Sequence, residues 1–337
     1  MAAGLKPGDE METEIRPINL LRRRDSGIFS KMPTRQGSIR LFKLFGITVY
    51  LHWAWFLAFA YFVQQASGQT SLMWGVLECL SLFLIVLIHE FGHQLACRSV
   101  GGKTSDIVLW VLGGVAYVSP PQRPGATLWS IAAGPLVNVV LIPILTVSLS
   151  ALGGHPSVHG IEPNEYAAFF NEIWFINFGL LIFNMLPIYP LDGGQILRSL
   201  LWFVFGKARS LMIASYIGFV GVAGLVAFAF WAQSFWMGIM CVFILMNCLG
   251  GLMQARAMAK MASVPRREGF ACPVCKTAPP LGAIWRCGKC RQPFDTFETQ
   301  GVCPHCQTQY AAIFCPECGN QRPISEWMTS PNVPPTL

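Results

Sequence analysis

The chain has 337 residues, of which 53% are hydrophobic and only 12% are charged. A soluble globular domain carries about 25% charged residues, so this composition excludes an ordinary soluble enzyme and indicates a protein with several membrane spans. The formal net charge of +7 reflects Lys and Arg residues placed in particular loops, which is a signal of membrane topology and not of nucleic-acid binding.

Six apolar segments of membrane-spanning length define a domain over residues 41–260. They lie at about 44–64, 74–97, 126–151, 167–187, 208–231 and 235–254. The preceding residues 1–40 are polar with mixed charge and little periodicity, so we expect a disordered basic N-terminal arm. An even number of spans places both termini on the same side of the membrane.

Lys and Arg are distributed on one side of the predicted spans. They occur before the first span, after the second, between the fourth and fifth, and after the sixth. The three opposite loops, about 65–73, 152–166 and 232–234, contain neither residue type. Because positively charged loops stay in the cytoplasm, both termini are expected to be cytoplasmic. The plasma (inner) membrane is the expected location.

A His-Glu-Phe-Gly-His motif, residues 89–93, lies near the end of the second span. On a helix, His89 and His93 lie one turn apart on one face, so that both imidazoles can bind one zinc ion. Glu90 is placed to take a proton from a zinc-bound water. Ionisable residues are costly at membrane depth, so the motif predicts a functional site. The alternative is two core histidines paired with a glutamate.

A β-hairpin is predicted between the second and third spans. Two β-rich runs, 106–112 and 115–118, flank Gly113-Gly114. Such short runs cannot cross a bilayer, and an open strand edge cannot face lipid, so the hairpin should line a protein cavity. There it could hold a substrate as an added strand. The alternative is an ordinary cytosolic loop hairpin.

The candidate for a third zinc ligand is Asp192, at the end of the fourth span. Pro187 and Pro190 break that helix, and Gly193-Gly194 lets the backbone bend. Irregular backbone at membrane depth is tolerated only where it lines a buried cavity. A helix that ends just before an aspartate therefore indicates a break that presents a ligand. The alternative is an interfacial turn with a capping aspartate.

Four segments together resemble the site-2 protease family of intramembrane zinc metalloproteases. Gly46–Trp53 is similar to the family's opening strand and first helix, His89–His93 to its HExxH motif, Ala133–Asn138 to its Gly-Pro…Asn pattern, and Asn184–Gly194 to its Asn-Pro-Asp-Gly signature. The resemblance covers about residues 45–200 in the family's order and spacing. It implies cleavage of single transmembrane helices within or near the bilayer.

The resemblance also implies roles for individual residues. His89, His93 and Asp192 would bind the catalytic zinc, and Glu90 would be the general base. Asn138 and Asn184 become catalytic candidates near the scissile carbonyl, where a buried amide could donate a hydrogen bond to the oxyanion. The alternative for each asparagine is a hydrogen bond between helices.

Eight cysteines follow the spans, in a module predicted over residues 268–322, and 323–337 form a Pro-rich tail expected to be disordered. The cysteines form four CxxC pairs: Cys272 and Cys275, Cys287 and Cys290, Cys303 and Cys306, Cys315 and Cys318. They predict two tetrahedral structural zinc sites in a cytosolic double zinc ribbon. Two arrangements remain open, in which the pairs combine consecutively or interleave. A cytosolic protein partner is favoured over nucleic acid.

Taken together, the sequence predicts an all-α polytopic membrane protein with about six transmembrane helices, a small β-hairpin and a double zinc ribbon. The expected function is that of an intramembrane zinc metalloendopeptidase with one catalytic and two structural Zn²⁺ ions. Single-span membrane proteins are the expected substrates, and the lipid bilayer is the medium. The alternative from another class is a non-catalytic membrane scaffold whose zinc ribbons bind protein or nucleic acid, although the intact Glu90 argues against it.

Overall fold

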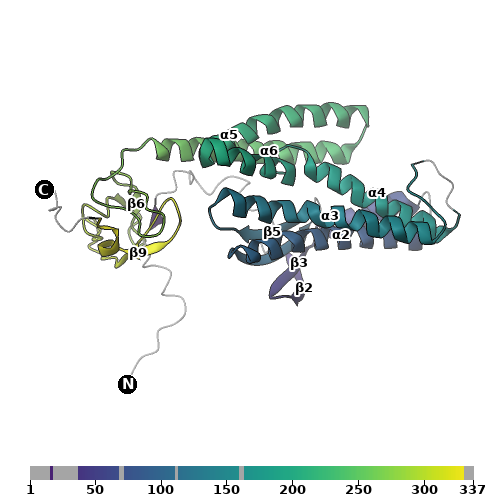
Figure 1. Cartoon of the computed structure of the whole chain (residues 1–337), viewed down its shortest axis with the longest axis horizontal. Helices are drawn as coiled ribbons and strands as arrows, with labels where there is room; N and C mark the ends of the chain where they lie inside the picture. Colours follow the sequence, from purple (N-terminus) through teal and green to yellow (C-terminus); the bar gives the residue numbers. More distant parts are fainter. Residues whose placement is uncertain (1–15, 18–36, 68–71, 111–112, 159–162, 330–337) are drawn as a thin grey trace, which may run out of the picture. The chain divides into compact units, whose positions relative to one another are not determined.

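The computed structural model describes residues 16–17, 37–67, 72–110, 113–158 and 163–329 (Figure 1). The chain divides into two compact units. One unit consists of residues 28–255 and contains the apolar helices. The other combines residues 1–27 with residues 256–337 and contains the cysteine pairs.

Five helices within the described residues are long and apolar enough to cross a membrane. They are α2 (Leu72–Ser99), α3 (Pro124–Ala151), α4 (Glu165–Met185), α5 (Asp192–Trp231) and α6 (Phe235–Ala262). A helix satisfies its own backbone hydrogen bonds, which a bilayer cannot do. Large apolar side chains are exposed on these helices, including Val147 at 69% and Val220 at 75%. Lipid can cover such surfaces, so the prediction of a multi-pass membrane protein is confirmed.

The sequence predicted about six transmembrane helices, and the first of them takes a different form. Residues predicted as a span over 44–64 form strand β3 (Ile47–His52) and then helix α1 (Trp55–Ser67). A helix of 13 residues is about 20 Å long, whereas the hydrocarbon core is about 30 Å thick. Burial alternates strictly along β3, as expected for a strand with one face covered.

A four-stranded sheet adjoins α2, with the strand order β2-β3-β4-β5. It contains β2 (Ser38–Leu44), β4 (Lys103–Trp110) and β5 (Gly113–Ser119). The pair β3–β4 is parallel and the two flanking pairs are antiparallel. The predicted hairpin is therefore present as β4 and β5, and β5 lies at an edge of the sheet.

One face of this sheet packs against α2 next to the histidine motif. Buried residues of β3 and β4 form a hydrophobic core with Leu87 and Phe91 of α2. Leu87 and Phe91 lie one turn apart, on the face of the helix that also carries Glu90. The sheet is thereby held beside the polar motif.

Helix α4 ends at Met185 and α5 begins at Asp192, so the predicted break before Asp192 is present. Two glycines make the intervening turn compact. A Cβ atom on Gly193 would lie 2.3 Å from the carbonyl oxygen of Met185, and one on Gly194 would lie 2.4 Å from the backbone of Ile188. Only glycine allows the start of α5 to approach the preceding backbone so closely.

The second unit is a small cysteine module built from short strands. It contains β1 (Arg16–Pro17), β6 (Trp285–Arg286), β7 (Pro293–Phe294), β8 (Ala312–Phe314), β9 (Gln321–Pro323) and the 3₁₀ helix η3 (Ile324–Trp327). The strands form one sheet in the order β1-β6-β7 and a hairpin of β8 and β9. Trp285 and Trp327 are fully buried in a core that they share with the cysteines.

This module extends beyond the predicted boundaries of 268–322. Trp327 belongs to its core, and the Trp327 carbonyl accepts a hydrogen bond from the amide of Ala271. Residues 323–329 of the predicted disordered tail are therefore part of the folded module, and residues 330–337 lie outside the described residues. In the predicted disordered arm over 1–40, Arg16–Pro17 form β1 and β2 begins at Ser38, while residues 1–15 and 18–36 lie outside the described residues.

Candidate active site and metal centres

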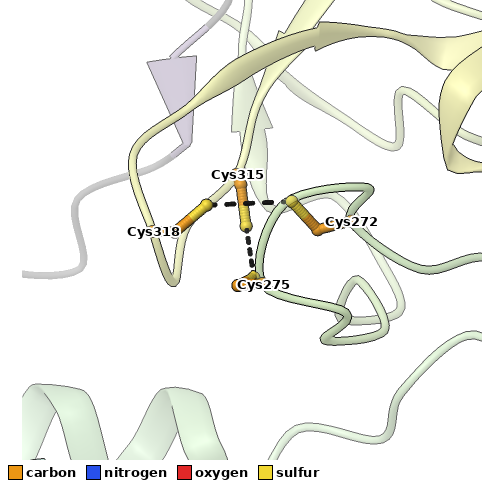
Figure 2. Close-up of side chains that lie close together, drawn as sticks. All are labelled: Cys272, Cys275, Cys315 and Cys318. Atoms are coloured by element: carbon orange, nitrogen blue, oxygen red, sulfur yellow. Dashed lines mark hydrogen bonds between the residues drawn. The ribbon is translucent and has the colours of Figure 1, made fainter. Parts of the chain in front are cut away.

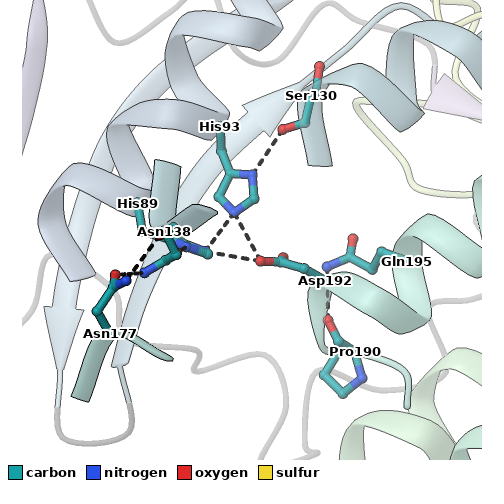
Figure 3. Close-up of polar contacts among 8 residues, drawn as sticks. All are labelled: His89, His93, Ser130, Asn138, Asn177, Pro190, Asp192 and Gln195. Atoms are coloured by element: carbon teal, nitrogen blue, oxygen red, sulfur yellow. Dashed lines mark hydrogen bonds and ion pairs between the residues drawn. The ribbon is translucent and has the colours of Figure 1, made fainter. Parts of the chain in front are cut away.

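Three side chains from α2 and α5 converge at the break before α5 (Figure 3). The Nε2 atoms of His89 and His93 lie 3.1 Å apart. The Oδ2 atom of Asp192 lies 3.0 Å from Nε2 of His89 and 3.4 Å from Nε2 of His93. All three side chains are nearly excluded from solvent. The structure thus brings together the three residues predicted as ligands.

The other nitrogen of each imidazole is committed to an acceptor. His93 Nδ1 donates to the carbonyl oxygen of Ser130 at 2.9 Å. His89 Nδ1 lies 2.6 Å from Oδ1 of Asn138. Asn138 Nδ2 in turn donates to Oδ1 of Asn177, and Asn177 Nδ2 donates to the backbone carbonyl of Asn138. A backbone carbonyl can only accept, so this chain of bonds orients both amides and makes His89 Nδ1 a donor.

These bonds determine what the converging atoms can do. A neutral imidazole that donates through Nδ1 has a lone pair on Nε2. Two such lone pairs and the carboxylate of Asp192 therefore point at one another without a proton between them. A cation bound among them removes this repulsion. Two histidines and a carboxylate, with a fourth position left open, form the ligand set of a catalytic zinc site, and outer partners that hold each imidazole are typical of it.

Close approach of α3 completes the pocket around the histidines. A Cβ atom on Gly134 would lie 2.3 Å from Nε2 of His93 and 2.8 Å from Nε2 of His89. No side chain fits at this position, so the glycine lets the α3 backbone press against both rings.

Glu90 lies between α2 and the sheet edge, beside the converging ligands. Its side chain is buried, and a Cβ atom on Gly114 of β5 would lie 2.5 Å from Cγ of Glu90. The backbone N–H of Ala116 donates to the Glu90 carboxyl group. Glu90 is not one of the three converging ligands, so its carboxyl group is available for proton transfer.

The two predicted asparagines have different surroundings. Asn138 accepts a hydrogen bond from His89 on α2 and donates one to Asn177 on α4, as expected from the alternative of hydrogen bonds between helices. Its contact with a substrate carbonyl stays a prediction. Asn184 is half-buried near the end of α4 and makes no hydrogen bond to the ligands within the described part of the chain. Asn177, which sequence reasoning missed, is fully buried and completes the chain to His89. Its position in the middle of an apolar span was the signal that could have found it.

In the cysteine module, the eight sulfurs form two clusters with a nested pairing. The first and fourth CxxC pairs form one cluster, and the second and third form the other: Cys272, Cys275, Cys315, Cys318 and Cys287, Cys290, Cys303, Cys306. Figure 2 shows the outer cluster, in which sulfurs of the two pairs lie 3.7 Å apart. This nested pairing differs from both the consecutive and the interleaved arrangement, and it places the short loop 291–302 between the two pairs of the inner cluster.

All four CxxC pairs share one backbone conformation. The amide of each first cysteine donates to the carbonyl five residues on, and its own carbonyl accepts from the amide four residues on. This turn directs both sulfurs of a pair to one side, which suits a tetrahedral zinc site. The hydroxyl and amide of Thr308 lower the pKa of the Cys306 thiol to about 6, so that Cys306 is a thiolate at neutral pH.

Helices of membrane-spanning length that hold a His-His-Asp set beside a buried glutamate define a membrane-embedded site of the zinc-hydrolase type. Residues 78–164 and 157–228 match the model of peptidase family M50. The predicted resemblance to the site-2 protease family is confirmed by this match. The cysteine module lies outside the matched residues.

The chain is also similar to individual proteins over part of its length. The chain is 35% identical over 182 residues to a zinc metalloprotease of Methanocaldococcus jannaschii, covering 54% of this chain and 50% of that protein. It is 31% identical over 193 residues to a putative zinc metalloprotease of Synechocystis, covering 54% and 49% respectively. The chain spans about half the length of these curated relatives. The solved structure of a site-2 protease from M. jannaschii aligns with a TM-score of 0.49 and 26% identity, covering 64% of this chain and 95% of that one.

Proposed function

We propose that this protein is an intramembrane zinc metalloendopeptidase that cleaves single-span membrane proteins within or near the bilayer. The observation that carries the proposal is the convergence of His89, His93 and Asp192, with Glu90 buried beside them. The site lies on helices of membrane-spanning length. The match to peptidase family M50 supports the same reaction class.

The residues present can perform hydrolysis in a short sequence of steps. Zinc, when bound, supplies Lewis-acid chemistry and makes a coordinated water acidic. Glu90 accepts a proton from the attacking water, whose oxygen forms a bond to the peptide carbonyl carbon. Glu90 then returns the proton to the leaving amine nitrogen as the C–N bond breaks. Ser130 and Asn138 keep both imidazoles in the orientation that this arrangement requires.

The edge strand β5 is the proposed binding surface for substrate. A transmembrane helix must unwind before its peptide bonds become accessible, and in a low-water cleft its freed backbone groups need new partners. An open strand edge provides these partners in register. The amide of Ala116 contacts Glu90, so that a strand added to β5 would pass the general base.

Both termini are proposed to be cytoplasmic, in the plasma membrane. The N-terminal residues Arg16–Pro17 pair with Trp285–Arg286 of the C-terminal module, and such pairing requires one common compartment. This supports an even number of crossings, in which β3 and α1 together make the first. The distribution of Lys and Arg then favours the cytoplasmic side. We further propose that the cysteine module holds two structural Zn²⁺ ions and docks a cytosolic protein.

The test is co-expression with candidate single-span proteins, comparing the native chain with Glu90→Gln. The variant should retain zinc, because His89, His93 and Asp192 are untouched. Cleavage should fall by at least about a hundredfold, because general acid–base catalysis is lost. Glu78→Gln is the control, since Glu78 lies on the same helix outside the described site. Near-native cleavage by Glu90→Gln would rule out the proposed mechanism, whereas the absence of cleavage by the zinc-loaded native chain would favour the non-catalytic scaffold.

A further inference from the structure

Gln94 is a fully buried polar residue on α2 for which the mechanism above has no role. It lies one helical turn after Glu90, on the face that meets the sheet. Its Nε2 atom donates to the backbone carbonyl of Asp106 on β4 at 3.2 Å. Its Oε1 atom has no hydrogen-bond partner in the described part of the chain. A leucine would fill this space without an unmet acceptor, so apolar packing alone does not account for the glutamine.

Asp106 lies in a β-bulge of the hairpin. Thr104 pairs with Val118, but the next pair is Ile107 with Ala116, so β4 carries one residue more than β5 in this interval. A bulge fixes the register of an antiparallel pair, and a slip by one residue would turn every side chain to the other face. Gln94 therefore joins α2 to the point that sets the register of the hairpin.

The first pair after the bulge leads directly to the general base. Ala116, the partner of Ile107, donates its N–H to Glu90. Gly114, two residues before Ala116 on β5, lies against the Glu90 side chain. The contacts thus form a closed circuit from Gln94 to the bulge, across the strand pair to Ala116, and back to α2 at Glu90. Gln94 thus holds the hairpin at the bulge, and Ala116 contacts Glu90, the proposed general base.

We propose that Gln94 is a positioning residue that sets the register of the β5 edge relative to Glu90 and thereby selects the peptide bond that is cut. This inference rests on the proposed function and deepens it. A substrate strand added to β5 takes its register from β5. Adjacent peptide bonds lie about 3.3 Å apart along a strand, so a small displacement of the edge brings another bond to the site.

The test uses the full-length chain carrying Gln94→Met, which keeps the side-chain length but removes the hydrogen bond. Zinc content, cleavage rate and the masses of the products are measured with one single-span substrate. Zinc should be retained, cleavage should spread to neighbouring bonds, and the rate at the native bond should fall on the order of tenfold to a hundredfold. Thr146→Val is the matched control. It removes a helix-to-helix hydrogen bond with Trp174 and should leave the cut in place.

A second variant addresses the register directly. Deletion of Ser105 removes a residue from the bulged interval of β4, leaves Gln94 in place, and should move the cut as Gln94→Met does. If either variant retains zinc and cuts the native bond alone at the native rate, the inference is overturned. Loss of zinc in Gln94→Met also overturns it, because Gln94 would then support the metal site. If the zinc-loaded native chain cleaves no substrate, the proposed function itself fails.

Discussion

At the scale of single residues, the absence of a side chain at position 134 is as important as the ligands themselves. Gly134→Ala would place a Cβ atom 2.3 Å from Nε2 of His93, so either the ring or α3 must move. We expect the variant to lose zinc from the active site and with it all cleavage, as measured by metal analysis of the purified chain.

Gly224→Ala provides the matched control for this substitution. Gly224 also lies in a long apolar helix, α5, but no atom lies within 4 Å of a Cβ built there. Zinc and cleavage should both be unchanged, and stability should rise slightly because alanine favours helix. A zinc-loaded, active Gly134→Ala would contradict the close approach of α3 to the ligands.

Asn177 acts on the metal only through two intermediates, Asn138 and His89. Asn177→Leu leaves the Asn138 amide free to turn, so that His89 Nδ1 loses its fixed acceptor. Loss of such an outer partner typically costs about 10–100-fold in metal affinity or activity. Zinc titration of the purified variant measures the effect.

Asn171 is the comparison residue on the same helix. Its side chain bonds the backbone of Ser157 and has no contact with the ligand network. Asn171→Leu should leave zinc affinity unchanged, although it removes two hydrogen bonds. If both variants lost zinc affinity equally, the cause would be a less stable α4 helix and not a change in the orientation of His89.

At the scale of elements, the nested pairing in the cysteine module predicts an order of metal loading. The inner cluster closes the short loop 291–302, whereas the outer cluster joins the ends of the longer segment 276–314. Closing a longer loop costs more entropy unless the segment is already folded. Cys287→Ser should therefore lose both structural ions, and Cys315→Ser only one. Metal analysis of the two variants tests this order of loading. If the two clusters were independent, each variant would lose one zinc ion.

The first predicted span shows where reasoning about elements was incomplete. Apolar length favoured a span over 44–64, although the resemblance of Gly46–Trp53 already implied an opening strand there. Ile47, Val49 and Leu51 are buried and alternate with half-buried positions. This two-residue period was visible and is typical of a strand. The break at Asp192 was predicted correctly because proline and glycine act through local backbone geometry. The bulge in β4 was not predictable, since it depends on pairing with β5.

At the scale of the whole molecule, the protein should hold three zinc ions in two kinds of site. The set of His89, His93 and Asp192 leaves a coordination position open, while four cysteines close the shell around the ion. A chelator should therefore remove one ion quickly, together with cleavage activity, and two slowly. Parallel time courses of zinc release and cleavage measure this. Release of all three ions at one rate would contradict the distinction.

The amino-acid sequence by itself determined the membrane class, the hairpin, the break before α5, the cysteine pairs, and the residues proposed as the ligand set and the adjacent base. These features depend on apolar length, local turn chemistry and one helical turn between His89 and His93. Tertiary structure alone decided the nested cysteine pairing, the role of Asn177, the tie from Gln94 to the bulge, and the need for glycine at position 134. Each of these depends on contacts between segments far apart in the chain, which spacing along a sequence does not encode.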